Sequence, residues 1–305
     1  MAPPYNLSRN ARGRGAEHSP AAAFRALRSC GETNIWWWRP PLRTDPADLP
    51  LLNTEEFRQA LCLRSELDAA AYVHARAAAR RAVGKLLGVG PEEIDLDQRT
   101  CPACGDPGHG PPRLGRPDLP LAISLARTAG HGVFAAGTGS AIGVDAEVLR
   151  PVRRDVLSES WLTADEGLHL LTLPRGPARD AVFYRCWTRK EAVVKARGRG
   201  LKGIQLDRIE SYPATSGTVR MHCPDQPGPA PGLGAADRDT AERHGPGTTD
   251  TDASRTDTWI VRDLELSDRM AAAVAQPEDT AAAYGPVRLH LPAGSTARRN
   301  SPGAR

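Results

Sequence analysis

The chain has 305 residues, enough for two ordinary domains, and its 40 Lys and Arg exceed 36 Asp and Glu by a net charge of +4. Arginine carries most of this excess, which favours anionic partners such as nucleotides, nucleic acid or acidic proteins without choosing among them. No apolar run approaches the roughly 20 residues that cross a bilayer. Six irregularly spaced cysteines and no signal peptide indicate a reduced, cytoplasmic protein rather than a disulfide scaffold.

The composition along the chain predicts two folded halves and three segments without a core. Residues 1–33 are rich in Arg, Ala, Gly and Pro, so we expect a disordered extension or a start codon placed too far upstream. Residues 34–150 and 151–276 form the two halves. The second half contains a polar tract at 224–257 that we expect to be a disordered insertion, and a disordered tail is expected over 277–305.

The first half begins with a strand and two helices. The run IWWWR at Ile35–Arg39, closed by two prolines, predicts a buried or edge strand. Its three tryptophans would also suit base stacking, but no surrounding basic and aromatic pattern supports that use, so core or interface packing is favoured. Asn53 is expected to cap a helix that runs towards Leu63, and a longer helix is expected over Glu66–Leu87.

Two features of this half invite a functional interpretation. Arg76 and Arg80 lie one helical turn apart and would clamp a phosphate together, although solvated arginines on a helix back explain the pair equally well. Cys101 and Cys104 form a CxxC, but no second CxxC follows and His109 is the only nearby further ligand, which argues against a structural zinc.

A pair of acids follows two predicted strands, at 121–125 and 132–136. In the run AIGVDAE, Asp145 and Glu147 are two residues apart, so on a strand both carboxylates point to one face. Their mutual repulsion would be relieved by a cation, and carboxylates with phosphate and water oxygens are the usual magnesium ligands. The alternative is a strand end with solvated acids, because DxE is common by chance.

The second half is predicted to begin with a helix that Thr163 caps and Pro174 ends. A helix over Ala181–Ala196 follows. Strands are then expected over 204–209 and 218–221 as partners, and a hairpin over 259–266 and 270–275 closes this half.

The most informative stretch is Trp187–Leu201, which reads WTRKEAVVKARGRGL. As a helix it places Trp187, Glu191 and Lys195 at i, i+4 and i+8, with Lys190 beside them. Glu191 would ligate a hard cation or accept a proton, and Lys195 would neutralise a phosphoryl oxygen. The alternative is a solvated helix whose Glu-to-Lys pair contributes about 0.3–0.5 kcal/mol.

Together, the DxE at 145–147, the WTRKEAVVKA at 187–196 and the GRGL at 198–201 resemble the two signature motifs of the surfactin-synthetase type of 4′-phosphopantetheinyl transferases. The resemblance covers about Ile35 to Ala275 without the insertion. It implies an α+β (α/β) fold with pseudo-twofold symmetry, in which two similar halves each pack a long helix on a small antiparallel sheet. It also implies a monomer with internal pseudo-dimer symmetry that binds coenzyme A between the halves.

The resemblance further implies a reaction and roles for the motif residues. The family moves the phosphopantetheine arm of coenzyme A to a serine of an acyl, peptidyl or polyketide carrier protein, as in secondary metabolite biosynthesis, and releases 3′,5′-ADP. Carried over by position, Asp145, Glu147 and Glu191 would hold Mg²⁺. Glu191, or a metal-bound water near it, would take the serine proton. Lys195 would contact the α-phosphate and stabilise the leaving group, and Lys190 would belong to the coenzyme site. Neither nucleic acid nor a membrane is expected as a partner.

The coenzyme-phosphate pocket is where the chain departs from the family. Arg76 and Arg80 fall where the family places an arginine near the adenosine end of coenzyme A. The family's histidine for the 3′-phosphate is replaced here by Arg127, which can bind a phosphate at least as well. The lysine that usually follows the glycine of the preceding loop is missing here, where the chain has Gly110–Pro112, so either the affinity for coenzyme A is lower or Arg113 reaches in.

Two alternatives to transfer remain open at this point. A protein that keeps the coenzyme site without catalysis is suggested by the altered positions around Arg127. A metal-dependent nuclease is suggested by spaced carboxylates followed by ExxxK in a basic chain, although the order of the motifs argues against it.

Overall fold

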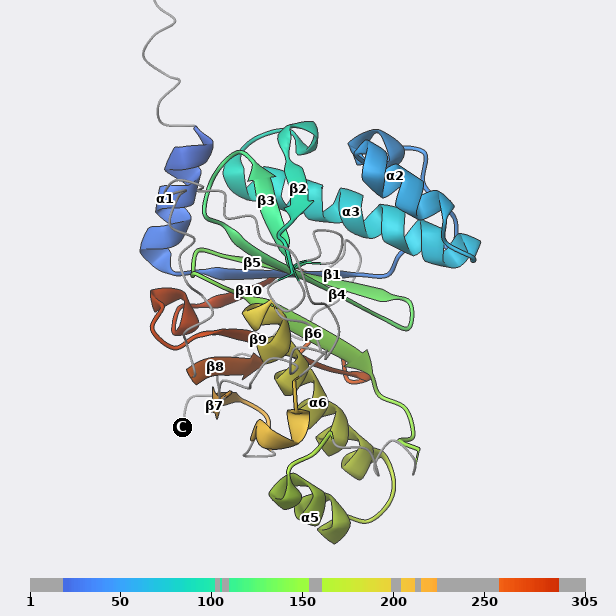
Figure 1. The fold of residues 1–305 in the computed structure, drawn as a ribbon, viewed down its shortest axis with the longest axis vertical. Coiled ribbons are helices and arrows are strands. Elements are labelled where there is room, and N and C mark those ends of the chain that lie inside the picture. Colours follow the sequence, from blue (N-terminus) through green and yellow to red (C-terminus); the bar gives the residue numbers. More distant parts are fainter. Residues whose placement is uncertain are drawn as a thin grey trace, which may run out of the picture.

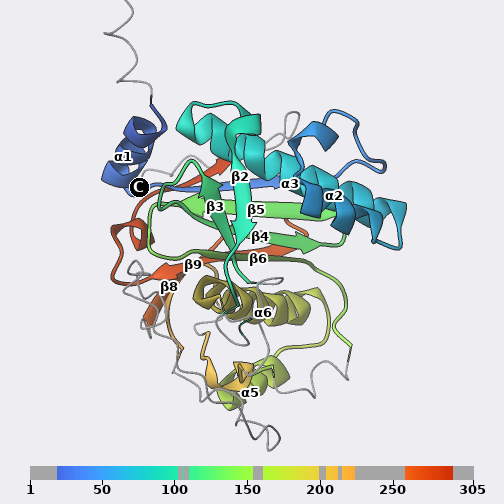
Figure 2. The ribbon, with the colours of Figure 1, turned by 45° about the horizontal axis from the view of Figure 1, so that its top comes forward.

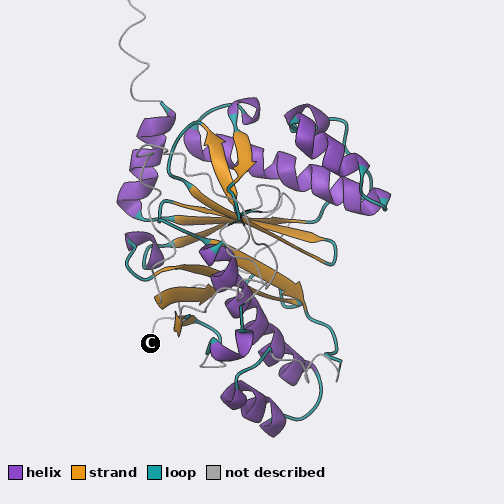
Figure 3. Ribbon diagram, viewed as in Figure 1, coloured by secondary structure: helices purple, strands orange, loops and turns teal. Residues whose placement is uncertain are grey.

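The computed structural model describes residues 19–101, 105, 110–153, 161–198, 204–211, 215–223 and 258–290. Two four-stranded sheets lie between an upper and a lower layer of helices (Figures 1 and 2). Colouring by secondary structure shows the strands in the middle of the molecule and the helices outside them (Figure 3). This arrangement confirms the predicted mixed α+β class.

The first sheet has the order β10-β1-β5-β4. Its strands are β1 (Thr33–Trp38), β4 (Ala122–Thr128), β5 (His131–Gly137) and β10 (Val287–His290). The upper layer consists of α1 (Pro20–Cys30), α2 (Thr54–Leu61) and α3 (Glu66–Leu87), with the short ribbon β2 (Asp95–Gln98) and β3 (Pro112–Arg116) and the 3-10 turns Leu49–Leu51 and Pro91–Glu93. All pairings in this sheet are antiparallel except β1 with β10.

The second sheet has the order β6-β9-β8-β7 and is antiparallel throughout. Its strands are β6 (Gly143–Val148), β7 (Thr218–His222), β8 (Thr258–Asp263) and β9 (Met270–Pro277). The lower layer holds α5 (Ala164–Thr172) and α6 (Pro177–Arg197), and two further 3-10 turns span Leu206–Arg208 and Ala281–Ala283. The second sheet therefore repeats the pattern of four strands and one long helix.

Because successive strand residues point to opposite faces, hydrophobic cores form between α3 and the first sheet, between the two sheets, and between the second sheet and α6. On β1, Ile35 faces the space between the two sheets, while Trp36 and Trp38 face α3. On β6, Val144 and Ala146 lie in the same core between the sheets, so the alternate residues of this strand face α6. The predicted use of the tryptophan run in packing is confirmed, because Trp36 and Trp38 belong to the core under α3.

Most predicted elements are confirmed, and the caps explain why. Asn53 and Thr163 each form a capping box with the glutamate three residues later, and Gly88 ends α3 with a left-handed φ of 70°. The hairpin of β8 and β9 is also present. None of the helices in the described ranges is long and apolar enough to cross a membrane.

Four sequence-based expectations need correction. The predicted strand at 204–209 is wrong: Leu206–Arg208 is a 3-10 turn whose Leu206 and Ile209 pack under α6, and β7 pairs with β8 instead. The segment predicted to be a disordered extension contains α1, which Ser19 caps and whose Phe24 is buried under α3. The predicted tail contains β10, and β6, expected in the first half, pairs with β9 in the second sheet.

Candidate active site

The candidate active site forms where β6 crosses α6. The inward alternation of Val144 and Ala146 leaves Gly143, Asp145 and Glu147 facing the helix. A Cβ on Gly143 would lie only 1.9 Å from the backbone oxygen of Ala192 on α6, so only glycine lets the strand approach the helix this closely. Gly143 is thus a residue of the site that sequence reasoning missed, and its signal was its position two residues before the DxE.

The close approach brings Asp145, Glu191 and Lys195 together. The Lys195 Nζ donates to Asp145 Oδ1 at 2.6 Å. The other oxygen of Asp145 and the Oε1 of Glu191 are buried and have no hydrogen-bond partner. Glu147 is held differently, because its Oε2 accepts a hydrogen bond of 2.6 Å from the Thr128 hydroxyl on β4. The structure therefore gathers the predicted acids and the predicted lysine and adds Thr128 to them.

Burial and repulsion between the carboxylates make the ionised state of this cluster costly. Burial, then the negative charges of Asp145 and Glu147, raise the pKa of Glu191 to about 7, although Lys195 opposes the rise. Burial also raises the pKa of Asp145, against the stabilising charge and hydrogen bond of Lys195. Lys195 is one positive charge against three carboxyl groups, so a bound cation would stabilise their ionised forms.

The donor atoms suit a hard divalent cation. Two buried carboxylate oxygens without partners, on Asp145 and Glu191, are the kind of ligand that magnesium takes in proteins. Within the described ranges, however, no three His, Cys, Asp or Glu side chains are already arranged around one metal position. Glu147, whose Oε2 accepts from Thr128, would offer its other carboxylate oxygen to complete the predicted set.

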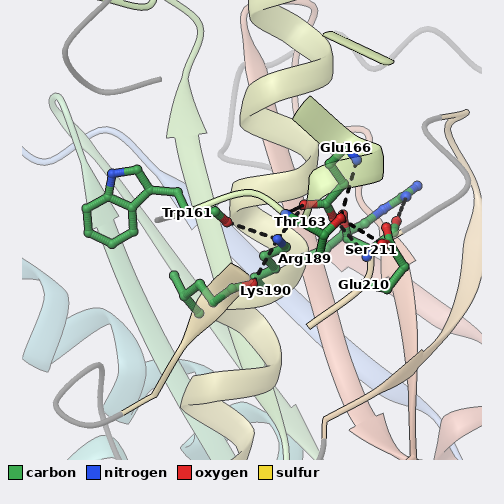
Figure 4. A network of polar contacts seen from close by, with 8 residues as sticks. Trp161, Thr163, Glu166, Arg189, Lys190, Glu210 and Ser211 are labelled. Atoms are coloured by element: carbon green, nitrogen blue, oxygen red, sulfur yellow. Dashed lines mark hydrogen bonds and ion pairs between the residues drawn. The ribbon is translucent and has the colours of Figure 1, made fainter. Parts of the chain in front are cut away.

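Lys190 is not part of this cluster, which corrects its predicted place in the coenzyme site. Its side chain is fully buried, and its ammonium donates to Glu166, to the Trp161 carbonyl at 2.9 Å and to the Leu206 carbonyl at 2.9 Å (Figure 4). An ammonium has three donors, so no donor of Lys190 remains for a phosphate. Adjacent residues of a helix differ by about 100° in direction, which is why Lys190 and Glu191 face different neighbours.

The predicted arginine clamp is only half present. Arg80 is 3% exposed and is held by the Glu56 carboxylate and by the Ile94 carbonyl, so it does not face a ligand. Arg76 is partly exposed, with its guanidinium 5.1 Å from the centre of the Tyr72 ring. The guanidinium of Arg127 lies 5.8 Å from the same ring centre. The structure thus places Arg76 and Arg127 against one ring, while Arg76 also lies 3.7 Å from the Glu56 carboxylate that holds Arg80.

Several predicted features lie outside the described residues. They include Cys104 and His109 of the zinc hypothesis, Gly200 and Leu201 of the second motif, and the insertion at 224–257. Gly198, which is described, ends α6 with a φ of 72° as expected for a C-cap.

A cavity of about 480 Å³ opens directly after β6, between residues 149–152 and the first turns of α6. Its apolar lining includes Leu149, Val152 and Phe183, and the side chains of Arg150, Arg175 and Arg179 also line it. An apolar hollow with three arginines fits an acidic partner that carries an apolar side chain.

Comparison with known proteins agrees with these motifs. Residues 141–235 match the model of the 4′-phosphopantetheinyl transferase superfamily. The chain is 33% identical over 106 residues to the 4′-phosphopantetheinyl transferase ffp of Bacillus subtilis, an alignment that covers 35% of this chain and 42% of that protein. It is 29% identical over 113 residues to Sfp of Bacillus subtilis strain 168, which covers 37% of this chain and 49% of Sfp. It is 27% identical over 180 residues to HetI of Nostoc sp. PCC 7120, which covers 57% of this chain and 71% of HetI.

The alignments with ffp and Sfp span less than half the length of those relatives. Both of these proteins, like HetI, are named as 4′-phosphopantetheinyl transferases. The predicted resemblance to this superfamily is therefore confirmed.

Proposed function

Residues 141–235 match the model of the 4′-phosphopantetheinyl transferase superfamily, and we propose that the chain transfers phosphopantetheine from coenzyme A to a carrier-protein serine. The observation that carries the proposal is the meeting of Asp145, Glu191 and Lys195, two of whose carboxylate oxygens are buried without partners. Such a cluster is suited to a phosphoryl transfer, which needs charge neutralisation and positioning more than covalent help.

In the proposed reaction, the serine hydroxyl attacks the phosphate that bears the pantetheine arm. A new serine O–P bond forms, the P–O bond to the second phosphate breaks, and 3′,5′-ADP leaves. Glu191, or a water beside it, takes the serine proton. Lys195 neutralises a phosphate oxygen of the leaving group.

Magnesium would be held by Asp145, Glu147 and Glu191. Bound there, it would neutralise charge on the pyrophosphate. The two unpartnered oxygens support this assignment of Asp145 and Glu191. The link from Thr128 to Glu147 keeps the third carboxylate beside them.

The direct test is incubation of the full chain with coenzyme A, magnesium and a panel of apo fatty-acid, polyketide and peptide carriers. Mass spectrometry should show addition of phosphopantetheine to a carrier serine. Absence of transfer to every carrier by folded protein would refute the proposal. Coenzyme A binding by calorimetry without any transfer would instead favour the non-catalytic alternative.

Arg127 and Arg76 are proposed to bind the 3′-phosphate of coenzyme A, because both guanidinium groups lie against Tyr72. Arg127→Ala should weaken coenzyme A binding by roughly 10-fold or more, the loss typical of a hydrogen bond to a charged group. Calorimetry with 3′-dephospho-coenzyme A is the control, since wild type and variant should bind it equally. Equal loss for both ligands would place Arg127 away from the 3′-phosphate.

The cavity after β6 is proposed as the carrier side of the site. Arg175→Glu reverses an exposed charge that lines it and should raise the KM for an acidic carrier by about 10-fold while leaving the KM for coenzyme A unchanged. Arg25→Glu makes the same charge change at an exposed position of α1 and serves as the control. A carrier KM that responds equally to both substitutions would reflect net charge alone.

The repeated pattern of sheet and helix supports a pseudo-twofold relation between the two halves. Coenzyme A is proposed to bind between these halves, and the protein is proposed to be a cytoplasmic monomer. Light scattering should give a mass near 32.7 kDa. Twice that mass at micromolar concentration would contradict the monomer.

A further inference from the structure

A second polar cluster lies behind the candidate active site, in the space between α5 and α6. It consists of Lys190 from α6, Glu166 from α5, Ser211 and Thr163, and Figure 4 shows their polar groups turned towards one another. The indole of Trp161 points away from this cluster, while its carbonyl faces Lys190. None of these groups takes part in the proposed chemistry.

The cluster is fully satisfied. Glu166 Oε1 accepts from the Ser211 amide at 2.9 Å and from the Ser211 hydroxyl at 2.5 Å, and Oε2 accepts from Lys190 and from the Thr163 amide at 2.9 Å. Both Lys190 and Glu166 have 0% side-chain exposure. Neither group can reach a substrate from this position.

Stability alone does not account for such a pair. Replacing a buried ion pair by neutral side chains of similar volume is often neutral or stabilising, because desolvation offsets most of the attraction between the charges. The pair does fix a direction, since three hydrogen bonds from Lys190 tie one side of α6 to Glu166 on α5, to Trp161 and to Leu206. Two further bonds from Ser211 hold the Glu166 carboxylate in place.

A second set of contacts restrains the helix one residue earlier. Arg189 makes two bonds to the Asp263 carboxylate, at 2.9 and 2.7 Å, and bonds of 2.7 Å to the carbonyls of Ser211 and Thr215. Residues 189, 190 and 191 point in directions about 100° apart. With Arg189 and Lys190 both restrained, the direction of Glu191 towards Asp145 is set.

We propose that the buried Glu166–Lys190 pair is a positioning element that fixes the rotation of α6 and thereby aims Glu191 at Asp145. The proposal rests on the proposed function and gives Lys190 a role in the reaction without contact with coenzyme A. A helix with side chains has a radius of about 5–6 Å, so a rotation of about 20° would move the Glu191 carboxylate by roughly 2 Å. A misplacement of about 1 Å can cost about 10²-fold in rate.

The test is the double variant Glu166→Gln with Lys190→Met, which removes both charges and keeps the side-chain volumes close to native. We expect the folded double variant to keep its KM for coenzyme A within two-fold of wild type and its kcat to fall by 10- to 100-fold. Calorimetry should also show weaker magnesium binding, which does not depend on any carrier. The single variant Ser211→Ala, which keeps the ion pair, should lower kcat less.

Asp48→Asn is the matched control. Asp48 is another buried carboxylate, which accepts from His74 and Arg81 beside α3, on the far side of both sheets from α6. Its neutralisation should lower the thermal midpoint and leave kcat unchanged, which separates a loss of stability from a loss of positioning.

The possible outcomes distinguish failure of the positioning role from failure of the proposed transferase function. An unchanged kcat in the folded double variant would overturn the positioning role but not the proposed function. A raised KM for coenzyme A with normal kcat would also overturn the positioning role, and it would return Lys190 to the coenzyme site. If the double variant does not fold, an unchanged kcat and magnesium affinity in Ser211→Ala would overturn the role. Wild-type protein that neither transfers phosphopantetheine nor binds magnesium would overturn the proposed function, and the positioning role with it.

Discussion

Glu191→Gln is expected to lower the rate of phosphopantetheine transfer by on the order of 10²- to 10⁴-fold, the usual contribution of a general base, while the fold stays intact. The substitution keeps the shape of the side chain but removes its negative charge and its capacity to take a proton. The unpartnered Oε1 shows that Glu191 contributes no hydrogen bond through that atom to the structure, so the fold does not depend on it.

The rate should be measured as product mass against time at saturating coenzyme A and carrier. Glu265→Gln, the same change at an exposed position outside the site, is the control and should retain the wild-type rate. Full activity of the Glu191 variant would refute both the metal assignment and the proton transfer assigned to this residue.

The same substitution should stabilise the protein at alkaline pH in the absence of metal. The pKa of Glu191 is about 7 in the folded protein against 4.5 for the unperturbed group, chiefly because the residue is buried. Between these values the native state holds a proton that the unfolded state has lost, so the free energy of unfolding falls as pH rises through this window. By about pH 8 the loss is roughly 3 kcal/mol, and Glu191→Gln avoids it.

Urea unfolding of wild type and variant from pH 5 to 8, without divalent ions, measures this effect. The curves should be close at pH 5 and separate towards pH 8, with the variant the more stable. Added magnesium at pH 8 should narrow the gap by binding the wild-type carboxylates. A variant less stable than wild type at pH 8 without metal would show that the carboxylate is not strained in the fold.

Local signals allowed much of the fold to be predicted. The helix at Glu66–Leu87 begins and ends where its serine cap and its glycine indicate, and the strands of the DxE and of the last hairpin follow their apolar patterns. The convergence of Asp145 with Glu191 also follows from the two motifs, because they lie on adjacent elements.

The errors arose where a residue's neighbours, rather than its own sequence, decide its role. Lys190 and Glu191 are adjacent in one motif, yet the position of α5 turns one into a buried structural cation. Arg80 has the spacing of a phosphate clamp but meets Glu56 from α2. The 3-10 turn at Leu206 replaces a strand because its carbonyl bonds to Lys190. None of these partners is close in sequence, so periodicity could not reveal them.

The parallel pairing of β1 with β10 has a consequence for biosynthesis. His290 bonds to Asn34 across 256 residues of chain, so one edge of the first sheet cannot form until almost the whole chain has left the ribosome. At about 5–20 residues per second, the tryptophan strand waits some tens of seconds with one edge unpaired. An apolar strand with an open edge is prone to pair with other chains, so yield during expression should depend on how well chaperones cover this strand before the last one arrives.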